Sequence, residues 1–138
     1  MSTADLITVF VSLFVIIDPI ALAPLFIALT KGQDARHRRA VGLRACLVAF
    51  GLLTVFGLVG DTLLSFLGIS MSAFRIAGGL LLFFTALDML FERRTQRRQG
   101  QAHENPDHDD PSVFPLAVPL IAGPGAIATM ILLAGAEG

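Results

Sequence analysis

The sequence contains no tryptophan and no tyrosine, and only one cysteine, Cys46, among its 138 residues. Tryptophan and tyrosine usually anchor a membrane protein at the lipid–water interface, and the 11 phenylalanines lack the polar tips that this role needs. A single cysteine excludes a disulfide within the chain. Charged residues amount to 15% and fall mostly into two short tracts, neither long or basic enough to indicate nucleic-acid binding.

Long apolar runs dominate the rest of the sequence. Hydrophobic residues make up 54% of it and the mean hydropathy is +0.75, which is typical of an integral membrane protein. Several runs reach about 20 residues, the length at which a helix crosses a bilayer. We therefore predict an all-α membrane protein with about four transmembrane helices, over residues 4–29, 40–67, 72–91 and from 113 onward.

The basic residues are distributed asymmetrically about these spans. None precedes the first span, and five follow it closely: Lys31, Arg36, Arg38, Arg39 and Arg44. The positive-inside rule places such a loop in the cytoplasm. We therefore expect the N-terminus to lie outside. The polar segment 92–110 is expected to be a flexible cytoplasmic linker whose basic half lies against the inner leaflet.

Histidines and acids lie close together in this linker, but they follow no ligand spacing typical of a metal site. We interpret His103, His108 and the neighbouring acids as solvated, and we expect neither a metal nor a cofactor. Within the spans there is no Ser/His, Cys/His or paired-acid group. We therefore expect no enzymatic activity.

The first span is interrupted by Asp18-Pro19-Ile20-Ala21-Leu22-Ala23-Pro24. Each proline removes a backbone donor and crowds the carbonyl four residues back, so the helix should kink or open here and free carbonyl oxygens. A carboxylate at this depth is costly and marks a functional candidate. We predict a binding site at Asp18, Pro19 and Pro24. Asp18 would hold a coupling cation, H⁺ or Na⁺, or the ammonium group of a substrate.

The same pattern returns 100 positions later without a gap. Ser12, Phe14, Pro19, Pro24, Ile27 and Ala28 correspond to Ser112, Phe114, Pro119, Pro124, Ile127 and Ala128. Asp18, however, corresponds to Val118. Paired proline-interrupted spans are typical of transporters built from inverted repeats, with the substrate between the breaks. The alternative is two unrelated helices that both contain prolines.

If the repeat is real, three intervening spans make the copies inverted, the start of a 3+3 architecture. Residues 1–91 would be the first three-helix repeat, 92–112 the polar linker, and 113–138 the first helix of the second repeat. Gly123, Pro124 and Gly125 join the candidate site, because glycine there exposes amides that could hold an anionic group.

Other residues in the spans call for a partner or close packing. Arg75 opposes the helix dipole in the first turn of the third span, so we expect it either to snorkel to the interface or to have headgroup phosphate, Asp61 or Asp18 beside it, and we include Arg75 in the candidate site. Asp88, in the last turn, is interpreted as an interfacial ion-pair residue. Ser72 is the expected N-cap of this span. Glycines expected to allow close helix packing are Gly51, Gly57, Gly60, Gly78 and Gly79.

Three motifs in order resemble the MarC family of bacterial integral membrane proteins. They are Asp18-Pro19 followed by Pro24-Leu25-Phe26, Gly68-Ile69-Ser70 leading into Arg75-Ile76-Ala77-Gly78-Gly79, and Pro115-Leu116-Ala117-Val118-Pro119 leading into Ala122-Gly123-Pro124-Gly125. The resemblance implies six spans in two inverted halves, a plasma (inner) membrane location and, for characterised transporters, uptake of small neutral amino acids. Ala21 stands where glycine often follows Asp-Pro-Ile. By the same comparison the chain is truncated after the fourth span.

The function expected from residues and resemblance together is secondary transport of small neutral amino acids or similar solutes. The expected partners are the lipid bilayer, the solute, a coupling cation and a second copy of the chain in a homo-oligomer. The alternative is a membrane scaffold that transports nothing, or a remnant left by truncation, in which the prolines serve only packing.

Overall fold

The computed structural model of the chain describes residues 2–103 and 110–136. Its elements are α1 (Thr3–Ile17), α2 (Pro19–Leu29), α3 (Ala35–Phe66), α4 (Met71–Leu90), α5 (Arg93–His103), η1 (Ser112–Ile121) and α6 (Pro124–Ala136). Helices α3 and α4 are each long and apolar enough to cross a membrane. The pairs α1/α2 and η1/α6 meet that test only together, with bends of 43° and 59°. The described residues are thus all-helical, as predicted, with two to four candidate spans.

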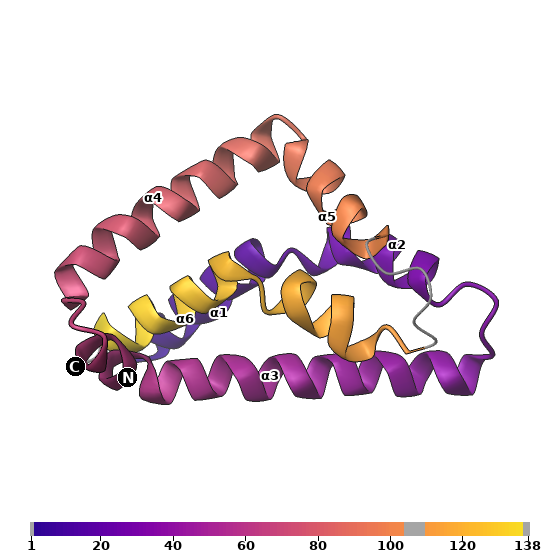
Figure 1. Cartoon of the computed structure of the whole chain (residues 1–138), viewed down its shortest axis with the longest axis horizontal. Helices are drawn as coiled ribbons and strands as arrows, with labels where there is room; N and C mark the ends of the chain where they lie inside the picture. Colours follow the sequence, from indigo (N-terminus) through magenta and orange to yellow (C-terminus); the bar gives the residue numbers. More distant parts are fainter. Residues whose placement is uncertain (1, 104–109, 137–138) are drawn as a thin grey trace.

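The bent pairs run in opposite directions beside α3 (Figure 1). Both chain ends and the turn from α3 to α4 gather at one end of the molecule, and the loop between α2 and α3 lies at the other. Helix α4 slopes away from α3, and α5 returns toward α2 and η1 and packs against both (Figure 1). The two helix breaks are thereby brought under α5.

Helix α6 occupies the centre of this arrangement. It packs against α1, α3 and α4. Its buried residues are Ala126, Ala128, Thr129 and Ile131. Glycines make room for it. A Cβ added at Gly60 would lie 2.7 Å from Ile131, and one at Gly78 would lie 3.0 Å from Leu132. The expectation of close packing is confirmed there and at Gly57, and it is wrong for Gly51 and Gly79, which face open space.

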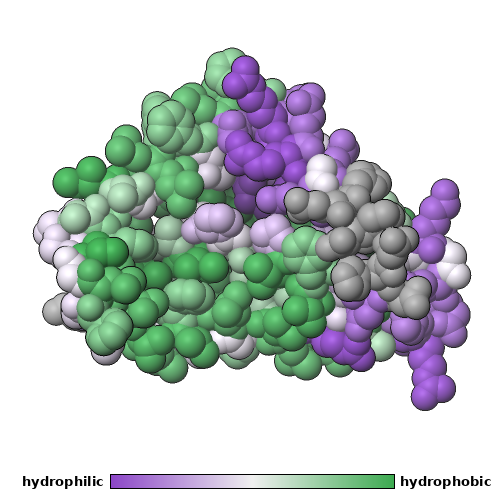
Figure 2. All heavy atoms as spheres, viewed as in Figure 1, coloured by the Kyte–Doolittle hydropathy of each residue, from purple (hydrophilic) through white to green (hydrophobic). Residues whose placement is uncertain are grey.

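Large apolar side chains cover the outward faces of the helices. Phe10 of α1 is 67% exposed, and Phe50 and Leu58 of α3 are 71% and 78% exposed. An apolar surface of this extent marks contact with lipid or another protein. Polar surface gathers over α5 and at the end that holds the α2–α3 loop (Figure 2). The molecule is therefore built to lie in a bilayer with α5 in a polar setting.

The polar segment after α4 is the main correction to the sequence-based expectations. We expected residues 92–110 to be flexible, but Arg93–His103 forms helix α5. Its face with Arg98 and Ala102 is buried, 6% exposed at each residue, because it packs against α2 and η1. The acids at 104, 107 and 109, together with His108, lie outside the described residues.

Two helix starts also differ from expectation. The N-cap of α4 is Ser70 instead of Ser72, and the Ser70 side chain accepts a hydrogen bond from the Ala73 N–H at 3.1 Å. Helix α3 begins five residues before the apolar run at residue 40, because the Asp34 carboxylate caps it by accepting from the His37 N–H at 3.0 Å. Polar capping residues, rather than the edges of the apolar runs, decide where these helices start.

We predict opposite effects of alanine at two glycines of α3. Gly60→Ala should lower the free energy of unfolding in detergent by about 1 to 3 kcal/mol, because the new methyl group meets the stiff, branched side chain of Ile131. Gly51→Ala is the matched control, since its Cβ meets open space and alanine favours a helix by about 1 kcal/mol over glycine. Melting followed by circular dichroism measures both. Equal melting temperatures for the two variants would contradict the packing of α6 on α3.

Candidate functional site

The first helix break lies at Asp18. This residue has φ 54° and ψ 65°, a left-handed conformation that ends α1 and begins α2. Its carboxylate accepts a hydrogen bond from the Ala21 N–H at 3.2 Å and so caps α2, whose first residue is Pro19. Pro24 lies inside α2 without breaking it. The predicted interruption is present, and Asp18 is its hinge.

The break leaves backbone carbonyls without helical donors, as expected, and α5 supplies the missing donors. The guanidinium of Arg94 donates to the Ile16 carbonyl, and Nη2 of Arg98 donates to the Ile17 carbonyl at 2.7 Å. Hydrogen bonds from a charged donor are stronger than those between neutral groups. Two arginines therefore tie α5 to the end of α1.

The second break is wider than the first. Wide turns in η1 are closed by hydrogen bonds from the Leu116 N–H to the Pro111 carbonyl, 3.1 Å, and from the Ala122 N–H to the Ala117 carbonyl, 2.7 Å. Val118, the counterpart of Asp18, has φ −132° and ψ 124° and so leaves the helical conformation. Helix α6 then restarts at Pro124. The chain is interrupted at corresponding positions, and the second copy also leaves the helical conformation at Phe114 and again before Pro124.

Two glycines let the second break close tightly. A Cβ at Gly123 would lie 2.7 Å from the carbonyl oxygen of Pro119, which is backbone and cannot move aside. A Cβ at Gly125 would lie 3.1 Å from the Ile16 side chain, so the start of α6 comes within contact of the end of α1. The two breaks are therefore neighbours in space.

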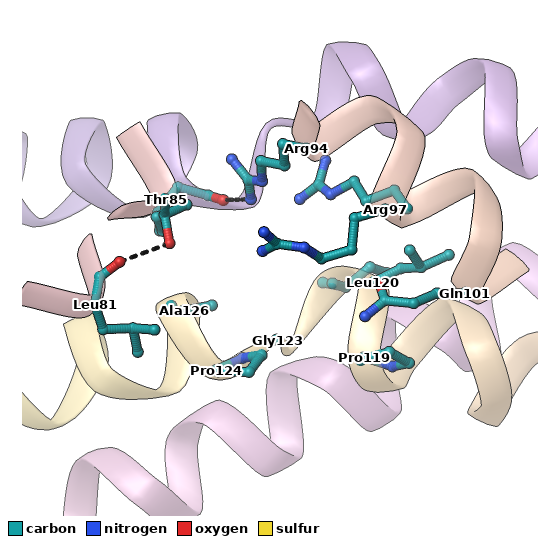
Figure 3. A pocket seen from close by; sticks show the side chains of 14 residues that line it. Leu81, Thr85, Arg94, Arg97, Gln101, Pro119, Leu120, Gly123, Pro124 and Ala126 are labelled. Atoms are coloured by element: carbon teal, nitrogen blue, oxygen red, sulfur yellow. Dashed lines mark hydrogen bonds between the residues drawn. The ribbon is translucent and has the colours of Figure 1, made fainter. Parts of the chain in front are cut away.

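A pocket of about 100 Å³ lies between the breaks and α5 (Figure 3). Its polar side consists of Thr85 of α4 and of Arg94, Arg97, Arg98 and Gln101 of α5. Its other side consists of Ile16, Leu81, Pro119, Leu120, Ile121, Gly123, Pro124, Gly125 and Ala126. Thr85 is held in place because its hydroxyl donates to the Leu81 carbonyl at 2.9 Å (Figure 3). None of these lining residues is acidic.

Burial governs the electrostatics of the arginines. The pKa of Arg98 is lowered to about 10, chiefly because burial disfavours its charged form and also because Arg94 is near, while Asp18 acts in the opposite direction. Burial likewise lowers the pKa of Arg94, again opposed by Asp18, and the charge of Arg97 lowers it further. The pKa of Arg98 still lies well above neutral pH, so its side chain stays protonated there.

Acids surround this cluster without entering the pocket. Arg94 and Arg98 also line a second cavity of about 90 Å³, and Asp18 opens onto that cavity. Arg97 forms an ion pair with Asp88, whose side chain is 18% exposed. The interpretation of Asp88 as an ion-pair residue is confirmed. Asp18 and Asp88 therefore act here as counter-charges to arginines.

The structure brings only part of the sequence-predicted site together. Gly123, Pro124 and Gly125 line the pocket, and Asp18 lies just beyond it. Pro19 lines a separate apolar cavity of about 360 Å³, which Pro24 does not line.

Arg75 lies away from the site. It is exposed near the start of α4, whereas α4 meets the Asp18 cavity at Met89, about 21 Å further along the helix at 1.5 Å per residue. The suggested pairing of Arg75 with Asp18 is wrong because the two lie at opposite ends of that helix. Asp61 is exposed near the end of α3.

Sequence reasoning missed the α5 residues of the pocket. Arg94, Arg98 and Gln101 recur at intervals of four and three, the spacing of one helical face. This spacing was available as a signal, but the polar composition of the segment favoured a solvated linker. A helix whose inward face is made of arginines has no apolar stripe from which its burial could be recognised.

We predict that Asp18 has a structural role separable from its charge. Asp18→Ala should destabilise the chain by about 2 kcal/mol, because it loses the cap, about 1 kcal/mol, and places alanine in a left-handed conformation that costs about as much again. Asp18→Asn should retain most of that stability, since asparagine caps helices and tolerates this conformation. Thermal melting in detergent compares the two. Equal losses for the two variants would show that the charge, which both of them lack, holds the break together rather than the cap.

Comparison with known proteins identifies relatives along most of the chain. The model of the MarC family of integral membrane proteins matches residues 3–138. A UPF0056 membrane protein of Archaeoglobus fulgidus is 42% identical over 125 residues, 90% of this chain and 59% of that protein. One from Aquifex aeolicus is 38% identical over 129 residues, 91% of this chain and 60% of that protein.

The UPF0056 inner membrane protein YhgN of Escherichia coli is 34% identical over 129 residues, 94% of this chain and 64% of that protein. The chain thus spans about three-fifths of the length of the first two relatives, at 59% and 60%. No solved structure matches it significantly. The family match covers nearly all of the described breaks, helices and pocket, so the resemblance seen in the motifs is confirmed: the chain belongs to the MarC family of integral membrane proteins.

Proposed function

We propose that this chain takes part in secondary transport of small neutral solutes, neutral amino acids foremost, and that the solute binds where the two broken helices meet. The observation that carries the proposal is the pocket of about 100 Å³ between the breaks. Interrupted helices in transporters place their free backbone groups at the substrate site. Here the end of α1 and the start of α6 come into contact beside that pocket.

The relation between the two bent pairs supports an inverted repeat. They run in opposite directions (Figure 1), and Asp18 and Val118, which correspond at an offset of 100 residues, both leave the helical conformation. The prolines have exchanged roles, because α2 starts at Pro19 and contains Pro24, whereas α6 starts at Pro124 and η1 contains Pro119. Inverted copies with different breaks would present different chemistry to the two sides of the site.

Helix α5 would act as the closure of this site on one side. Its arginines occupy the carbonyls that an open helix break would otherwise offer to a cation or a solute. Asp18 shares a cavity with the same two arginines, whose positive charges would oppose a cation there, so a coupling cation, H⁺ or Na⁺, would bind Asp18 only after α5 moves away. Movement of α5 would then couple the cation to the solute.

The proposed orientation has the N-terminus outside and α5 in the cytoplasm of a cell whose inner membrane holds the chain. In a Cys46→Ser background, cysteines introduced at Gln33 and at the exposed Gln99 of α5 should be shielded from an impermeant thiol reagent in intact cells. A cysteine at Ser2, at the opposite end of the molecule, is the control that should react. Labelling of the cysteine at position 33 or at position 99 in intact cells would contradict the proposed orientation.

Uptake of labelled alanine and glycine into liposomes tests the transport function. The chain and the E. coli relative YhgN should be reconstituted side by side, because the chain spans 64% of that relative. Uptake by neither would contradict the proposal and favour a scaffold. Uptake by the relative alone would show that this chain is not a transporter by itself.

The Asp18→Asn variant tests the coupling step. It should fold, since asparagine keeps the cap, but it should lose most of the uptake together with any dependence on pH or Na⁺. The liposome assay above, run with and without ion gradients, measures this. Uptake at the unsubstituted level with unchanged ion dependence would exclude Asp18 as the coupling site.

A further inference from the structure

The pocket between the breaks carries positive charge that its own residues do not balance. Three guanidinium groups line it, those of Arg94, Arg97 and Arg98. Two carboxylates near them are placed outside it, Asp18 on the second cavity and Asp88 in its ion pair with Arg97. Among the described residues of this cluster, one positive charge remains without a counter-charge.

Arg98 is the arginine with a buried donor that lacks an acceptor. The residue is 6% exposed, and its Nη2 is used by the Ile17 carbonyl at 2.7 Å. Its Nη1 is buried and has no hydrogen-bond partner among the described residues, although Arg98 lines the pocket. A buried charged donor without an acceptor is costly, so an acceptor supplied by a ligand would be strongly favoured.

The opposite wall presents further donors. Helix α6 starts at this wall with Pro124, Gly125 and Ala126, all of which line the pocket. The N–H groups of Gly125 and Ala126 precede the first α-helical acceptor and have no carbonyl within the helix, and the helix dipole places partial positive charge there. Gly125 has no side chain to shield them. Residues of two separate elements, α5 and the start of α6, therefore bring hydrogen-bond donors to the lining of one small space.

We propose that this pocket binds the carboxylate group of a small solute, one oxygen accepting from Nη1 of Arg98 and the other from the first N–H groups of α6. This inference deepens the proposed transport function and rests on it for the identity of the solute. No acid lines the pocket, so no carboxylate there would pair with the ammonium group of an amino acid. The carboxylate of the solute would therefore dominate recognition.

Binding to the purified 138-residue chain tests this directly. Sodium propionate and alanine should each raise the melting temperature saturably at constant ionic strength, whereas ethylammonium chloride should not. Arg98→Gln should weaken the propionate effect at least about tenfold, the loss expected for one charge-assisted hydrogen bond. Arg93→Gln, at an exposed position of α5 outside the pocket, is the matched control and should bind propionate normally.

Three results would overturn the inference. They are no stabilisation by propionate, stabilisation that survives Arg98→Gln, and inorganic phosphate binding more tightly than propionate with the same dependence on Arg98. The last result would assign the pocket to phosphate.

A second variant keeps the test decisive if Arg98→Gln does not fold. Asp88→Asn releases Arg97 from its ion pair beside the pocket, so propionate should bind several-fold more tightly. Unchanged or weaker binding would contradict the inference.

Alanine uptake into liposomes separates this proposal from the transport function. Propionate binding that depends on Arg98, without uptake by the unsubstituted chain or by YhgN, would support the carboxylate site and contradict the transport function. Uptake that is unaffected by Arg98→Gln would support the transport function and contradict the carboxylate site.

Discussion

The hydrogen bonds from two arginines to the carbonyls of Ile16 and Ile17 are the interactions on which the rest of this structure depends. Hydrocarbon offers no donor to a carbonyl freed by a helix break, and each unsatisfied group costs several kcal/mol. The donors come from 78 and 81 residues further along the chain. The polar segment after α4 is therefore drawn onto the membrane helices, which makes α5 part of the core of the site.

The same contacts explain why an acid is tolerated at Asp18. On insertion scales a carboxylate at the centre of a span costs about 2.5 to 3.5 kcal/mol. Here the carboxylate caps α2, and its charge stabilises the charged forms of Arg94 and Arg98. The acid and the arginines carry opposite charges around one cavity, so neither can be understood from its own segment.

The features that the sequence predicted are local ones. The apolar runs indicated the spans, and Pro19 and Pro124 marked the restarts of α2 and α6, because missing donors and helix length act within a few residues. What escaped prediction depends on distant partners. Gly60 packs and Gly51 does not because only one of them faces α6, and Arg98 is buried because a break 81 residues away needs a donor.

The difference between the two breaks gives the site its direction. At the first break, the freed carbonyls of Ile16 and Ile17 accept hydrogen bonds from Arg94 and Arg98 of α5. At the second break, α6 begins beside the pocket and offers N–H groups instead of carbonyls. Arg98 donates to the first break through Nη2, and its other terminal nitrogen has no partner in the described chain. If the proposed carboxylate took up that nitrogen, it would act on the same side chain that holds α5 against the first break, and occupancy of the pocket would then be linked to the position of α5.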